Sequence, residues 1–145
     1  LKVVPNGLLP VILTERKEHL EILKNLLSSR IRNLIVMKGG MRKRQRQDAH
    51  SALQTLPEDA EKAILATGKY LGEGFDDPGL DTLFLTLPIS WKGTLAQYAG
   101  RLHRVHDMKK EVIIYDYADL DVPMLRKMYE RRLSGYKAIG YEIGA

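Results

Sequence analysis

Three side chains in one short segment could act together on an anionic ligand. The segment at residues 97–104 is QYAGRLHR, and it places Gln97, Arg101 and Arg104 at i, i+4 and i+7. In an α-helix this spacing puts all three residues on one face. Two forked guanidinium groups on one face suit an anionic, oxygen-rich ligand. A solvated basic stripe is the alternative, and Gln97 also follows Thr94 at the spacing of a helix capping box.

The same segment carries a glycine where a helix favours another residue. Gly100 costs about 1 kcal/mol relative to alanine in a helix interior. Because it has no side chain, it lets another stretch of backbone come close. The opposite face of the segment is apolar, which predicts a helix that packs on one side and displays its arginines on the other. The apolar residues are Leu95, Tyr98, Leu102 and Val105.

A glycine-rich loop, TGKYLGEGFDD, follows a predicted strand at residues 67–77. Gly68 and Gly74 permit backbone shapes or a close ligand approach that other residues forbid, although an ordinary long turn uses glycines in the same way. Thr67 offers a hydroxyl at the strand end, and carboxylates such as Asp76 suit sugar hydroxyls or a partner arginine. The sequence contains no complete P-loop pattern. A nucleotide bound here would therefore need its main phosphate and metal cradle from another domain.

Positive charge is concentrated in one segment. The chain has a net charge of +5, and residues 30–48 hold seven basic residues against one acid, so this segment alone carries +6. Within it, KGGMRKRQRQ joins a predicted strand to a predicted helix, with Gly39 and Gly40 making the turn. Amide groups at a helix start, with Lys38 and Arg42 beside them, favour binding of a nucleic-acid backbone. A solvated helix face is the alternative that composition alone leaves open.

The composition also narrows the class of protein. A chain of 145 residues, 44% of them hydrophobic, is long enough for one domain with its own core. It has no cysteine, which removes disulfides and thiolate metal sites and is typical of a reducing cytoplasm. No apolar run approaches the ~18 residues of a membrane span, so we expect a cytoplasmic protein without a membrane partner. His103 and His106 lack an obvious third ligand, so no metal site is predicted.

Apolar runs alternate with helical patterns along the chain. The runs are mostly continuous, which is typical of strands buried on both faces of a parallel sheet. The order predicts an α/β fold, an open and mainly parallel sheet with helices on both faces. In such sheets ligands bind beyond the carboxyl ends of the strands, where Thr14, Lys38 and Thr67 fall. The predicted strands are 9–14, 33–37, 62–67, 81–88 and 111–118, and the predicted helices are 15–29, 41–56, 94–106 and 122–143.

Placed in order on these elements, the segments resemble the motifs of the second RecA-like domain of superfamily 2 helicases. QYAGRLHR is similar to motif VI, Q-x-x-G-R-x-x-R, at every fixed position, and ATGKYLGEGFDDPGLDTLF resembles motif V. VILTERKEHLEIL resembles motif IV, and VMKGGM resembles the turn after the next strand. The resemblance spans residues 8–118. In this region the amino-acid sequence is similar to that of DEAD/DEAH helicases akin to the motor subunits of type III restriction enzymes.

The resemblance implies a role for each group of residues. Arg104 would be the arginine finger for ATP hydrolysis, Arg101 would also reach the γ-phosphate, and Gln97 would help to order the site and the attacking water. The implied cofactor-binding residues are Gly74, Asp76 and Gly100. The implied nucleic-acid contacts are Thr14, Lys38, Gly39, Gly40, Arg42, Thr67 and Gly68.

The resemblance also implies a cofactor, partners and boundaries. The cofactor is ATP with Mg²⁺, held mainly by an N-terminal RecA-like domain of the same chain that lies outside these 145 residues. The second partner is nucleic acid, with DNA favoured over RNA. Residues 1–145 are expected to form one helicase C-terminal RecA-like domain, with a linker remnant at 1–7 and a helical extension at 119–145. Because the isolated domain would hold the finger without the cradle, we expect it to be catalytically inactive.

Two other classes of function remain open from the sequence. One is a non-enzymatic α/β module derived from a helicase domain that binds nucleic acid or protein. A P-loop motif and an acidic strand end upstream of Leu1 would favour the motor, and their absence would favour the module. The other is a nucleotide-sugar transferase, which gives no use to the stripe of Gln97, Arg101 and Arg104 and ranks last.

Overall fold

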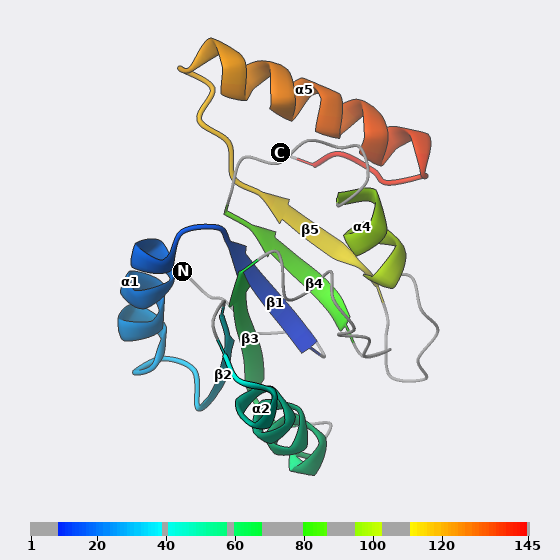
Figure 1. Ribbon diagram of the computed structural model, residues 1–145. Helices are drawn as coiled ribbons and strands as arrows, with labels where there is room; N and C mark the ends of the chain where they lie inside the picture. Colours follow the sequence, from blue (N-terminus) through cyan, green and yellow to red (C-terminus); the bar gives the residue numbers. More distant parts are fainter. Residues whose placement is uncertain are drawn as a thin grey trace.

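Five parallel strands form one sheet at the centre of the molecule, in the order β2-β3-β1-β4-β5 (Figure 1). The computed structural model describes residues 9–38, 41–57, 60–67, 80–86, 95–102 and 111–144. The strands are β1 (Leu9–Thr14), β2 (Asn33–Met37), β3 (Lys62–Thr67), β4 (Leu80–Leu85) and β5 (Ile113–Asp116). The helices are α1 (Lys17–Leu27), α2 (Lys43–Thr55), α4 (Ala96–Leu102) and α5 (Pro123–Ala138).

The three central strands are buried along their whole length. Every residue of β1, β3 and β4 is buried, as expected for apolar runs covered on both faces. The predicted bounds of β1, β2 and β3 are confirmed to the residue. The prediction was wrong for β4, which begins one residue earlier and ends at Leu85, and for β5, which is shorter at both ends. The ladder between these strands pairs only the four positions from Thr82 to Leu85 with Ile113 to Asp116.

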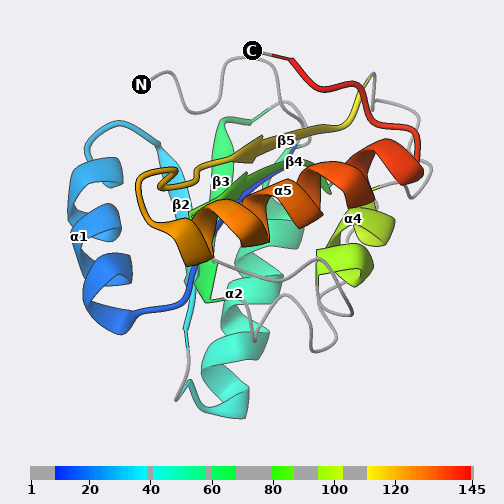
Figure 2. The same ribbon diagram turned by 90° about the horizontal axis from the view of Figure 1, so that it is seen from above.

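The helices cover both faces of the sheet, as predicted (Figure 2). Leu20 and Leu27 of α1 pack on one face with Ile31. On the other face α2, α4 and α5 contribute to a single larger core through Leu53, Tyr98, Tyr136 and their neighbours. The first two predicted helices are confirmed with shorter ends, and the third is confirmed as α4 up to Leu102, beyond which residues 103–110 lie outside the described part of the chain.

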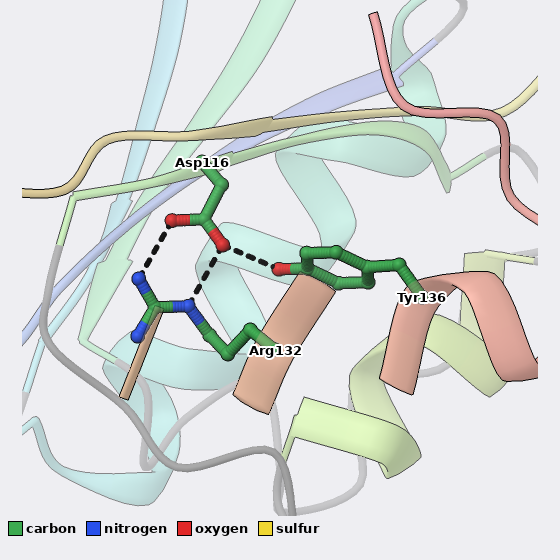
Figure 3. A network of polar contacts seen from close by, with 3 residues as sticks. All are labelled: Asp116, Arg132 and Tyr136. Carbon is green, nitrogen blue, oxygen red and sulfur yellow. Dashed lines mark hydrogen bonds and ion pairs between the residues drawn. The ribbon is translucent and has the colours of Figure 1, made fainter. Parts of the chain in front are cut away.

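A buried ion pair fixes α5 to the sheet (Figure 3). The Nε and Nη2 atoms of Arg132 donate to the two carboxylate oxygens of Asp116, at 2.7 and 2.8 Å, and the hydroxyl of Tyr136 donates to the same carboxylate at 2.7 Å. The side chains of Arg132 and Asp116 are only 2% and 8% exposed. Burial, and then the hydrogen bond to Asp116, raise the pKa of Tyr136 well above its ordinary value, so this hydroxyl stays protonated as the donor. The C-terminal helix therefore belongs to this domain's core.

The C-terminal helix ends before the predicted residue 143. It stops at Ala138, and Gly140 adopts a φ of +95°, a left-handed conformation in which other residues are strained. The amide of Tyr141 then donates to the carbonyl of Tyr136 at 2.9 Å, which closes the helix end. The chain consequently reverses direction and runs back along β5.

Candidate nucleic-acid interface

Two threonines stand side by side where β1 and β3 end. Thr14 and Thr67 are the last residues of their strands and are paired in the parallel register. The neighbouring strand β2 ends at Met37, which pairs with Ala66, so Lys38 follows at the same edge. The fold therefore brings three of the sequence-predicted nucleic-acid contacts together at the carboxyl edge of the sheet.

The two threonine hydroxyls differ in what they contact. Thr14 is 1% exposed, and its hydroxyl lies 2.7 Å from Nδ1 of His19 in the first turn of α1. Thr67 is 8% exposed, and its hydroxyl is buried without a hydrogen-bond partner among the described residues. A buried hydroxyl in this condition costs free energy that an incoming acceptor or donor would recover. Within the described part of this edge, Thr67 therefore has a buried hydroxyl that is available to a ligand.

Lys38 is held at the edge by an ion pair. Its Nζ atom lies 3.2 Å from Oε1 of Glu21 on α1, and both side chains are close to half exposed. The turn that follows is closed by Met41, whose amide donates to the carbonyl of Lys38. Because the pair is solvated, Glu21 orients the ammonium group without neutralising it strongly. The lysine therefore keeps a positive charge at this edge of the sheet.

The start of α2 carries basic residues, although the first turn of a helix favours acidic ones. The amide of Arg42 donates to Oε1 of Gln45 at 2.9 Å, so a side chain caps the helix start. Arg42, Lys43 and Arg44 are exposed, and the first turn has no acidic residue. Positive charge at the positive end of a helix dipole is unfavourable by typically 0.3–1 kcal/mol per charge. This arrangement suits an anion, which would contact both the basic side chains and the backbone amides at the start of the helix.

The motif helix packs as predicted, but its functional side chains are not placed. Leu95, Tyr98 and Leu102 are buried to 3% exposure or less, which fixes one face of α4 against the sheet. By helical phase, the backbone positions of Gln97, Gly100 and Arg101 lie on the opposite side. The remaining predicted site residues are outside the described residues: Arg104, Gly74, Asp76, Gly68, Gly39 and Gly40.

Sequence reasoning did not identify the residues that support this edge. His19 and Glu21, which contact Thr14 and Lys38, sit on α1 five and seven residues beyond the end of β1. A helix that begins directly after a strand places its first two turns over the strand end, and that spacing could have indicated both contacts. Within the residues that the structure describes, no group of three or more potential ligands could hold a metal ion. No helix there is long and apolar enough to cross a membrane.

Solved structures with the same arrangement of elements are similar to this chain at low sequence identity. The C-terminal domain of the DEAD-box protein Dbp5 matches at 17% identity and a TM-score of 0.68, over 95% of this chain and 73% of that one. The C-terminal part of the Fun30 ATPase domain matches at 22% and 0.66, and T4 UvsW at 14% and 0.65. The last two matches cover 93% and 92% of this chain, but only 43% and 29% of the Fun30 and UvsW chains. The likeness and the strand order define a RecA-like α/β domain.

Family membership follows from the sequence itself. Residues 6–106 match the family model described as the helicase conserved C-terminal domain. The chain belongs to this family and has the RecA-like fold of the similar solved structures. It is also 34% identical, over 82 residues, to uncharacterized protein 108L of Invertebrate iridescent virus 3, covering 57% of this chain and 74% of that protein. The finer likeness to type III restriction-enzyme motor subunits remains a prediction.

Proposed function

We propose that this chain is the second motor domain of an ATP-dependent helicase or translocase, and that its carboxyl sheet edge holds the nucleic-acid backbone. The unused hydroxyl of Thr67 carries the proposal, because it lies at the same edge as Lys38 and the basic start of α2. A phosphate at this edge would accept a hydrogen bond from the hydroxyl and lie against the lysine and arginines. Such contacts hold the backbone and carry no base sequence information.

The motif helix supports the ATP-facing part of the proposal. Arg101 and Arg104 supply guanidinium groups, and Gln97 supplies an amide, which suit a polyphosphate. The burial of Leu95 and Tyr98 fixes the opposite face of the helical segment in the core. Residues of an N-terminal domain would hold ATP and Mg²⁺, which supply the phosphoryl group and neutralise part of its charge. In the proposal Arg104 stabilises charge on the transferring group, Arg101 contacts the γ-phosphate and Gln97 orients the water.

Thr67→Val tests the nucleic-acid contact with a change of almost constant shape. Because the hydroxyl of Thr67 is buried and has no hydrogen-bond partner among the described residues, replacing it with a methyl group should leave the free energy of unfolding unchanged or raise it. Binding of fluorescein-labelled single-stranded DNA, measured by polarisation, should weaken about tenfold, since a charge-assisted hydrogen bond contributes about 1.5–3 kcal/mol. A parallel series with RNA of the same sequence tests the preference for DNA.

Thr14→Val is the matched control. Its hydroxyl contacts His19, so this change should lower the free energy of unfolding by about 1 kcal/mol. If Thr67→Val destabilises the chain like Thr14→Val and leaves DNA affinity unchanged, the hydroxyl serves the fold and the proposed interface loses its central contact. The non-enzymatic alternative is separated by ATP turnover: in a protein that includes the N-terminal domain, unchanged hydrolysis by Arg104→Ala would remove the motor role.

A further inference from the structure

The outer edge of β5 is open in the described part of the chain. This strand is the last of the sheet and pairs on one side only, with β4. The amide of Tyr117 donates to the carbonyl of Leu85 on β4, so the odd-numbered positions of β5 turn their main chain toward β4. By the alternation of a strand, Ile114 and Asp116 turn their main-chain N–H and C=O groups outward. An open edge of this kind is a template for one more strand.

A groove of about 770 Å³ runs along this edge. Its walls are β5, the underside of α5 and residues 140–144, which turn back beside the strand after Gly140. Five of the seven tyrosines of the chain line it: Tyr115, Tyr117, Tyr129, Tyr136 and Tyr141. Tyrosines offer large contact areas at a low cost in side-chain entropy. The groove thus has the lining of a peptide-binding surface.

One of the two exposed tyrosines of β5 is already held in place. The ring of Tyr115 stacks on Phe84 with 4.8 Å between the ring centroids and 11° between the planes, although Tyr115 is 45% exposed. Tyr117, on the same face of the strand, is 47% exposed. A partner would therefore bury ordered aromatic surface and lose little conformational freedom in doing so.

The charge of the groove opposes that of the chain. Its lining contains the carboxylates of Glu111, Asp116 and Glu142, and no lysine, arginine or histidine. Asp116 is paired with Arg132, so Glu111 and Glu142 set the local sign. Asp119 and Asp121 follow directly after the strand. In a chain with a net charge of +5, this acidic region favours a basic partner and repels nucleic acid.

We propose that the groove binds an extended, basic segment of a partner protein, which adds to the sheet as a sixth strand beside β5. Main-chain hydrogen bonds to Ile114 and Asp116 would hold the segment in register, as in other cases of strand addition. Its apolar side chains would lie on the tyrosines, and its lysines or arginines would reach Glu111 and Glu142. A second copy of this chain is disfavoured as the occupant, because a two-fold contact would bring the same acidic edges together.

Selection from a random peptide library tests this proposal directly. A display library of random 12-residue peptides is selected against the 145-residue chain, and the enriched peptides are synthesised with a fluorescein label. We expect sequences that alternate apolar and basic residues. Binding measured by polarisation should weaken about tenfold or more in Glu111→Lys/Glu142→Lys, the usual consequence of placing like charges in contact. The matched control Glu18→Lys/Glu61→Lys makes the same change of net charge at exposed sites elsewhere and should bind like the wild type.

Alternate N-methylation of the peptide tests strand addition itself. Methylating the amides of one register should abolish binding, and methylating those of the other should not, because a strand turns every second amide toward its neighbour. The proposal is overturned if no enriched peptide distinguishes the groove variant from the control, or if the enriched peptides are acidic. It is also overturned if sedimentation shows a dimer of the chain that Glu111→Lys/Glu142→Lys dissociates, since the edge would then pair with a second copy.

Discussion

Removing one partner of the buried ion pair should have a large effect on stability. In Arg132→Met the hydrocarbon stem is kept and the guanidinium group is removed, so the carboxylate of Asp116, 8% exposed, loses its counter-charge. Breaking a buried pair in this way costs about 3–5 kcal/mol. Two charge-assisted hydrogen bonds, at 2.7 and 2.8 Å, disappear at the same time. Because a domain of this kind is stable by only about 5–15 kcal/mol, the urea midpoint measured by circular dichroism should fall markedly.

Two further variants separate the effect of charge from the effect of packing. The double variant Asp116→Leu/Arg132→Met removes both charges, and should recover most of the stability, because a buried ion pair contributes little net stability over apolar residues of similar size. Arg131→Met changes the exposed neighbour and should stay within about 0.5 kcal/mol of the wild type. If Arg132→Met costs less than about 1 kcal/mol, or the double variant is no more stable than the single one, the pair does not hold α5 as described.

Three other outcomes are expected. Burial raises the pKa of Tyr141 to about 12 from 10, so the folded state keeps this proton to a higher pH than the unfolded state does. The free energy of unfolding should therefore fall between pH 10 and pH 12, and it should fall less steeply in Tyr141→Phe. If urea denaturation gives the same dependence on pH for both proteins, the raised pKa does not belong to Tyr141. In Arg42→Gln/Lys43→Gln, the slope of the logarithm of the DNA-binding constant against the logarithm of salt concentration should become shallower. The expected change is about 0.7–0.9 for each phosphate that the variant no longer neutralises, and polarisation across a potassium chloride series measures it. In a protein with both motor domains, Arg104→Ala should lower ATP turnover by about 10³–10⁵ with a much smaller change in ATP affinity, and a similar loss of both would point to misfolding or to a binding role.

The first three strands could be predicted from the sequence because each is a short apolar run with a clear end. β1 and β3 are buried along their whole length, whereas β2 is an edge strand whose first four residues are half-buried. A charged residue or a glycine follows each of the three runs, so their carboxyl ends are clear. The edge strand β5 lacks this advantage. Its extent is set by how far β4 runs beside it, which is a property of the pairing and not of the apolar run from Val112 to Tyr115.

The C-terminal helix shows which contacts sequence patterns miss. Its amphipathic pattern predicted a helix but did not say what it packs against, because the deciding residue, Arg132, has the same type as its exposed neighbour Arg131. Only the fold brings Asp116, sixteen residues earlier on β5, opposite that guanidinium group. At the carboxyl edge, by contrast, Thr14 and Thr67 could be predicted together, because parallel topology aligns strand ends whatever the distance along the chain.

The two proposed binding regions lie at opposite ends of the sheet and carry opposite charge. The basic segment at residues 30–48 surrounds β2, and the acidic groove lies beyond β5, with three strands between them. Thr67 ends β3, which lies three strand spacings from β5, roughly 14 Å at about 4.8 Å per strand. This separation exceeds the Debye length of about 8 Å at physiological salt. Nucleic acid and a basic peptide would therefore bind without strong electrostatic interference. It follows that Glu111→Lys/Glu142→Lys should leave DNA affinity and its salt slope nearly unchanged, and a large gain in DNA affinity would show that nucleic acid extends to the β5 edge.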